Sequence, residues 1–249
     1  MNNIRNGRPA APMVRLDEVI RSLERAIASV LGRRYEILPA EPPAPPRFLA
    51  TVFARRRGPV QRQSIPATDG VRLWLPAYLG IADRNLALER YRVMALQQAM
   101  RAMRGGADLI AGEDSPLVQD FFLLIEACAA DASLQRLSPE LAAPVAAARR
   151  AALAARPSLY AFPKSAQPLE RFVRRLMQSD RSQAEPVFDT PTAARSIESA
   201  KHIAGDLMPD GRPAGARRTT MLFRDRWTGE FRAADPCDHA GGASMTPLG

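Results

Sequence analysis

The sequence predicts a mainly α-helical protein: a helical bundle with a small β-hairpin-like element near residues 48–75 and a flexible C-terminal tail. Three observations predict this fold class. Apolar residues recur at three- and four-residue spacing over several long segments, which is the period of an amphipathic helix. Ser-Pro pairs at 115–116 and 138–139 are typical of helix starts. Clear alternation of apolar and polar residues, typical of a strand, is confined to the short run 71–75.

The N-terminal region, residues 1–38, is predicted to contain one amphipathic helix. Its apolar stripe consists of Leu16, Val19, Ile20, Leu23, Ile27, Val30 and Leu31. Gly32 is a suitable C-cap for this helix. Residues 39–47 are rich in proline, whose fixed φ favours an extended conformation. We interpret them as a linker to the main body.

The main body, residues 48–180, is predicted to be a helical core domain. Residues 48–53 suit a short strand or one helical turn, and Asp69-Gly70 indicates a turn before the strand 71–75. Helices are predicted over 83–104, from Ser115 through Cys128, from Ser138 to about Ala155, and around 169–177. The second of these is apolar on two adjacent stripes, which predicts that it lies at the centre of the bundle.

The remaining residues, 181–249, are more polar and are predicted to form a partly ordered tail. Thr190-Pro191 indicates the start of a helix that continues to about Ala204, and residues 219–223 suit a strand. After Phe231 the residues are small, polar and rich in glycine, which predicts disorder.

The charge of the chain is strongly basic, with a formal net charge of +9 supplied almost entirely by arginine. This balance favours nucleic acid or an acidic partner, but it also follows from a genome that encodes basic residues as arginine. The dispersed positions of the arginines favour the second explanation. Nucleic-acid binding therefore stays the alternative function, because neither a basic recognition helix nor an aromatic and basic platform is evident.

Residue types needed for catalysis are scarce. Neither Lys164 nor Lys201 follows a glycine, which excludes a Walker-type phosphate loop. The two histidines and two cysteines make neither a metal-ligand cluster nor a catalytic triad, and Cys128 lies in an apolar helix. We therefore predict a non-enzyme with no catalytic, cofactor-binding or metal-binding residues. Without an apolar run of membrane-spanning length or a secretory signal, the expected location is the cytoplasm.

Partner binding is the function class that remains. The candidate contacts are Arg55, Arg56 and Arg57, a dense basic cluster, together with Trp74 and Trp227. Each tryptophan follows a strand-like pattern and suits either a partner contact or the core. Glu126, on the most apolar helix, suits a paired or edge position better than a functional one.

One segment supports a more specific hypothesis. Residues 69–76, Asp-Gly-Val-Arg-Leu-Trp-Leu-Pro, are followed by Asn85 and by Tyr91-Arg92 in a predicted helix. This order resembles the N-terminal region of the NorD/CbbO family, whose members carry a C-terminal von Willebrand factor A domain and work with MoxR-type AAA+ ATPases. The resemblance covers roughly residues 50–180, with a weaker echo at 219–231.

The chain departs from the family at two points. Ala129-Ala130-Asp131 stands where the family usually has Arg-x-Asp, and the nearest match to the A-domain metal motif D-x-S-x-S ends in Gln135. The resemblance thus implies the family's N-terminal region without the A domain. It implies a non-catalytic adaptor that helps a MoxR-type AAA+ ATPase act on a client enzyme complex, for example a carbon-fixing enzyme or a nitric oxide reductase.

Overall fold

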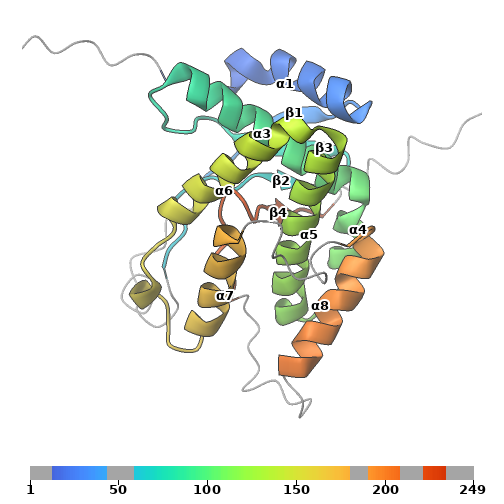
Figure 1. Cartoon of the computed structure of the whole chain (residues 1–249), viewed down its shortest axis with the longest axis vertical. Helices are drawn as coiled ribbons and strands as arrows, with labels where there is room; N and C mark the ends of the chain where they lie inside the picture. Colours follow the sequence, from blue (N-terminus) through green and yellow to red (C-terminus); the bar gives the residue numbers. More distant parts are fainter. Residues whose placement is uncertain (1–12, 44–58, 180–189, 208–220, 234–249) are drawn as a thin grey trace, which may run out of the picture.

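The computed structural model describes residues 13–43, 59–179, 190–207 and 221–233 (Figure 1). The fold is mainly α-helical with a small mixed sheet, as predicted. Its elements are α1 (Leu16–Leu31), β1 (Glu36–Ala40), β2 (Ala67–Thr68), β3 (Arg72–Pro76), α3 (Arg84–Arg104), α4 (Gly106–Ala111), α5 (Pro116–Leu137), η1 (Pro139–Leu141), α6 (Ala142–Ala155), η2 (Leu159–Ala161), α7 (Gln167–Gln178), α8 (Ala193–Leu207) and β4 (Glu230–Phe231).

The helices begin and end close to where the capping residues predict. Gly32 ends α1 in the left-handed conformation with φ 65°, and Gly105 ends α3 in the same way with φ 73°. The Asp83 carboxylate accepts a hydrogen bond from Leu86 N at the start of α3, and Ser115 caps α5. These local signals are strong because each satisfies a backbone group that the helix leaves unpaired.

The sheet has the strand order β1-β3-β2-β4. β2 and β3 form an antiparallel hairpin, and Asp69 closes its turn by accepting hydrogen bonds from Val71 N (2.9 Å) and Arg72 N (2.6 Å). The predicted turn and strand are thus confirmed, whereas the prediction for residues 48–53 lies outside the described residues. β1 pairs with β3 in parallel and β4 pairs with β2 in parallel.

β1 and β4 correct two sequence predictions. Pro39 was expected to begin the linker, but Pro39 and Ala40 are the last two residues of β1. A proline is tolerated there because β1 is an edge strand. Met221, Leu222 and Phe223 fall in the predicted strand 219–223, but the described part of that segment is not a strand, and the chain pairs only at Glu230–Phe231.

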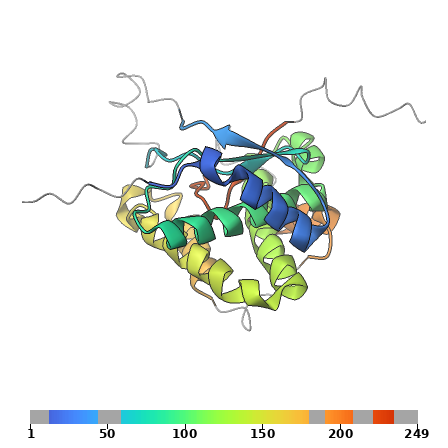
Figure 2. The same cartoon turned by 90° about the horizontal axis from the view of Figure 1, so that it is seen from above.

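The core has two hydrophobic clusters that meet along α5. One joins α1, β1, β3 and α3, and the other joins α5, α7, α8 and the segment 221–231. Figure 2 shows the sheet as a layer along one side of the molecule, and α3, α5 and α6 all lie on the inner side of this sheet. Most residues of α5 are buried, which confirms it as the central helix. Among the described helices, none is long and apolar enough to cross a membrane.

Candidate partner-binding surface

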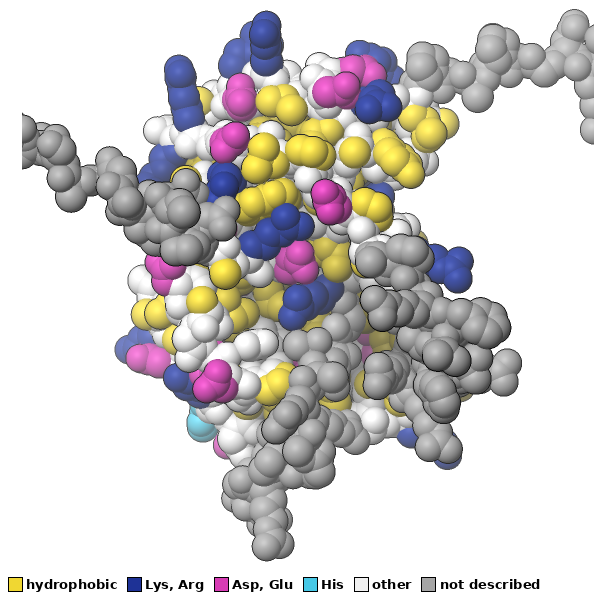
Figure 3. Space-filling view, turned by 180° about the vertical axis from the view of Figure 1, so that it is seen from behind, with side chains coloured by type: hydrophobic (Ala, Val, Ile, Leu, Met, Phe, Trp, Pro, Cys, Tyr) yellow, Lys and Arg dark blue, Asp and Glu magenta, His cyan; other side chains and the backbone are white. Residues whose placement is uncertain are grey.

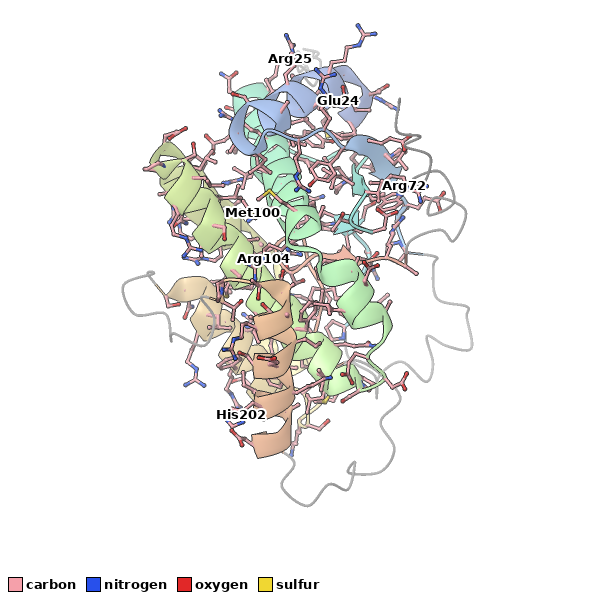
Figure 4. All side chains as sticks on the ribbon, turned by 90° about the vertical axis from the view of Figure 1, so that its right-hand side faces the viewer. Glu24, Arg25, Arg72, Met100, Arg104 and His202 are labelled. Carbon is pink, nitrogen blue, oxygen red and sulfur yellow. The ribbon has the colours of Figure 1, made fainter. Side chains whose placement is uncertain are left out.

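The outer face of the sheet is the side turned away from the helices. Side chains alternate along a strand, so Leu73 and Leu75 of β3 point into the core and are fully buried. Arg72 and Trp74, which alternate with them, are only half-buried. Leu38 of β1 stands beside Trp74 in the register and is also half-buried. Figure 4 shows Arg72 on the side of the sheet opposite α3 and α5.

Trp74 is the centre of this face. The Arg232 guanidinium lies over its ring at 4.6 Å from the ring centroid, and the Arg72 guanidinium lies at 5.6 Å. In a cation–π contact, the positive guanidinium is attracted to the face of the aromatic ring, so these contacts help to hold both arginines in place. We call Leu38, Arg72, Trp74 and Arg232 the outer sheet face.

The charge of the outer sheet face is mixed but leaves basic groups accessible. Arg72 pairs with Asp69 at 3.0 Å, and Glu230 lies 3.6 Å from Arg232 and 3.5 Å from Arg224. Asp69 is buried by its turn, whereas the side chains of Arg72, Arg232 and Glu230 are each partly exposed, at 19%, 33% and 24%. Figure 3 shows this side of the molecule, where hydrophobic side chains gather in the upper half with basic ones among them.

Trp227 lies in a different environment. It is 2% exposed, and its indole N–H donates to the Asp131 carboxylate at 3.0 Å. The other oxygen of Asp131 accepts from the Gln97 amide at 2.6 Å. The prediction that Trp227 contacts a partner is therefore wrong, because a side chain enclosed by α3 and α5 does not reach a partner.

Arg101 completes this buried group. It is 1% exposed and donates to the carbonyl oxygens of Trp227 (2.6 Å) and Thr228. Burial lowers the pKa of Arg101 and raises the pKa of Asp131, and in each case neighbouring groups oppose the shift. Gly229 follows with φ 58°, and a Cβ there would collide with Arg101. Arg101 and Gly229 therefore together fix the path of residues 221–231, which we call the C-terminal segment.

Arg104 binds a second buried carboxylate. Its guanidinium donates two hydrogen bonds to Glu126, at 2.9 and 2.8 Å, and Glu126 is fully buried. The Ser196 hydroxyl also donates to Glu126 at 2.5 Å, and Arg104 reaches the Thr190 carbonyl at 3.1 Å. Glu126 is thus paired, and the pair attaches α8 to α3 and α5.

Arg156 is the centre of a third cluster. It donates to both oxygens of Glu170 on α7, at 3.0 and 2.7 Å, and it forms an ion pair with Asp225. Arg174 also donates to Glu170, at 2.7 Å. The sequence indicates Arg156 only as a helix end, because its partners lie 14 and 69 positions away and no local spacing predicts them.

Asp120 on α5 accepts hydrogen bonds from the backbone N–H groups of Met221 (2.7 Å) and Leu222 (3.0 Å). Its other oxygen is buried without a hydrogen-bond partner. Burial raises the pKa of Asp120 to about 6, although the two N–H donors oppose this shift. Asp120 is therefore a titratable anchor of the C-terminal segment.

These arrangements connect α7, α8 and the C-terminal segment to the helical body. The buried acids are bound by arginines, by backbone N–H groups or by amide and indole donors. In the part of the chain that the structure describes, no group of three or more His, Cys, Asp or Glu side chains is placed to hold a metal ion.

The partner-contact residues that the sequence predicts therefore lie in different places. Trp74 lies on the outer sheet face, Trp227 is in the core, and Arg55, Arg56 and Arg57 fall outside the described residues. Sequence reasoning missed Arg232, which comes from β4 and lies over Trp74 only in the folded chain. Comparisons of the chain with protein-family models, with curated proteins and with solved structures give no significant match.

Proposed function

We propose that this chain is a non-catalytic adaptor that helps a MoxR-type AAA+ ATPase act on a client protein complex, and that the outer sheet face contacts the ATPase. The observation that carries the proposal is the half-buried Trp74 with Arg72 and Arg232 over its ring. Tryptophan and arginine are the side chains most enriched among residues that dominate protein interfaces.

The position of the family-like segment supports this partner class. Residues 69–76 form the hairpin turn and β3, and Arg72 and Trp74 are the residues of that segment on the outer face. The Tyr91 hydroxyl donates to the Pro76 carbonyl at 3.0 Å, so the two parts of the resemblance form one structural unit. Burial raises the pKa of Tyr91 to about 12, so this phenol keeps its proton.

The charge of the face suits an acidic surface. The partly exposed Arg72 and Arg232 favour association with acidic groups on the ATPase, and such attraction weakens with salt. The buried acids Glu126, Glu170 and Asp131 are engaged by donors inside the fold, and this supports surface contact as the function.

The test is co-purification with the MoxR-type ATPase encoded nearest to the gene of this protein. We expect a complex at low salt that dissociates as salt rises. Trp74→Ala is expected to weaken binding at least tenfold, a size typical of a central interface residue. Tyr160→Ala is the matched control, because Tyr160 is an aromatic side chain on η2 that is 90% exposed. Separate elution of the two proteins at low salt would exclude this function.

Nucleic-acid binding is the second candidate, and the same face favours it. An aromatic ring on an open sheet with arginines beside it is the kind of platform on which single-stranded bases stack. Filter binding of a single-stranded oligonucleotide over a salt series tests it. For a genuine site, log affinity falls linearly with log salt, and Trp74→Ala lowers the affinity. The absence of binding at low salt excludes nucleic-acid binding.

A further inference from the structure

A cavity of about 270 Å³ lies between α3, α6 and the C-terminal segment. Residues 60–63 close one side of it, and the Gln61 amide fixes this loop by donating to the Arg224 carbonyl at 2.8 Å. The cavity is separate from the outer sheet face and does not depend on the adaptor proposal. Its volume corresponds to about nine water molecules in the liquid, near the lower end of ligand pockets.

One wall of the cavity is apolar and shallow. It is formed by Ala148, Ala151, Ala152 and Ala155, which recur along one face of α6 at helical spacing. Methyl side chains leave space that longer residues would fill. Met94 of α3 and Trp227 line the cavity too. This lining suits a compact apolar group, such as one ring or a short chain.

Three arginines, Arg62, Arg90 and Arg226, line the cavity, and the last two are the more buried. Arg226 donates to the Leu79 carbonyl at 3.0 Å, but its Nε is buried without a hydrogen-bond partner. No carboxylate of the described residues lies within ion-pair distance of Arg226. Arg90 makes a long bond to the Pro144 carbonyl at 3.4 Å, and its nearest acid, Glu89, is 4.0 Å away.

The pKa directions of these arginines agree with the lack of a close carboxylate. Burial lowers the pKa of Arg226 and of Arg90, which shows that desolvation of each guanidinium is not offset by a close carboxylate. Asp225 also lines the cavity, but it is paired with Arg156 and accepts from Trp227 N and Thr228 N, both at 2.8 Å. Its charge is therefore already neutralised.

We propose that the cavity binds a small monocarboxylate with an apolar body, its carboxylate paired with Arg226 and its body against the alanine face of α6. An arginine binds a carboxylate through two parallel N–H donors, which makes the carboxylate the anion of choice for a site this small.

The experiment compares 3-phenylpropionate with 3-phenylpropan-1-ol, which has nearly the same shape but no charge. The chain has two tryptophans, so the Trp74→Phe variant leaves Trp227 of the cavity wall as the only strong fluorophore. We expect a saturable change of its emission with the acid, and at least tenfold weaker binding of the alcohol. Arg226→Met should reduce the affinity for the acid to that of the alcohol.

Arg195→Met is the matched control, because this arginine is on α8 with its side chain 71% exposed. It is expected to leave both affinities unchanged. Far-ultraviolet circular dichroism checks that each variant folds, and Arg226→Gln repeats the comparison if Arg226→Met does not fold. Equal binding of the acid and the alcohol overturns the proposal, and so does the absence of a saturable change with the acid.

Discussion

The outer sheet face and the C-terminal segment contain the same residue types in opposite environments. On the outer sheet face, Arg232 lies over Trp74 and both reach solvent. In the C-terminal segment, the Trp227 ring lies in the core, and buried Arg101 of α3 donates to the Trp227 carbonyl. This arginine is enclosed and donates to backbone carbonyls. An arginine near the surface keeps part of its side chain accessible to a partner, whereas a buried one mainly holds the fold together.

The comparison predicts a difference in what each region contributes. A buried ion pair is costly to break because the remaining charge has no water to solvate it. An exposed pair contributes little to stability. Substitutions in the C-terminal contacts should therefore lower the free energy of unfolding, and substitutions on the outer sheet face should change binding instead.

The largest effect is expected for Arg156→Met. It leaves Asp225 without its ion pair and takes two hydrogen bonds from Glu170. Removing one member of a buried ionic group typically costs about 3–5 kcal/mol. Urea unfolding followed by circular dichroism measures this loss. Arg174→Met is the control, because this side chain is 25% exposed and should cost clearly less.

The next effect depends on pH and concerns Asp120. Its pKa is about 6 in the fold and 3.8 in the reference state, so between these values the native chain keeps a proton that the unfolded chain releases. The free energy of unfolding therefore falls as pH rises through this window. Asp120→Asn does not titrate and keeps an acceptor for the N–H groups of Met221 and Leu222. Relative to the wild type, it should gain about 2 kcal/mol between pH 4 and pH 7, because the unfolded chain is already partly ionised at pH 4.

Urea unfolding of both proteins at several pH values measures this difference. Other titrating groups are shared, so they cancel in the comparison. Parallel curves for the two proteins would show that Asp120 titrates normally and that its burial has no energetic consequence.

A smaller loss is expected for Trp227→Phe. Phenylalanine fills most of the volume but leaves one oxygen of Asp131 without its donor. An unsatisfied buried acceptor costs about 1–3 kcal/mol. Thermal unfolding monitored at 222 nm tests this loss. An unchanged midpoint would mean that Asp131 finds another donor or takes up a proton.

Local signals explain how much of this structure the sequence predicts. Asp83, Ser115 and Gly32 act on groups within four residues, so helix ends follow from the sequence. The pairing of β1 with β3 joins strands far apart in the chain and has no local signature. The same holds for the candidate surface. Trp74 is recognisable as a candidate, but Arg232 becomes its neighbour only after β4 pairs with β2.

The smallest expected effect tests the outer sheet face itself. Trp74→Ala and Arg232→Ala should each lower the free energy of unfolding by less than about 1 kcal/mol, because both side chains are partly solvated. The double variant should lose less than the sum of the two single losses, by about 0.5–1 kcal/mol, since the cation–π contact is lost only once. A double-mutant cycle by urea unfolding measures this coupling. Strictly additive losses would show that Arg232 is not held by Trp74, and the outer sheet face would then lack the ordered arginine on which its partner-binding role depends.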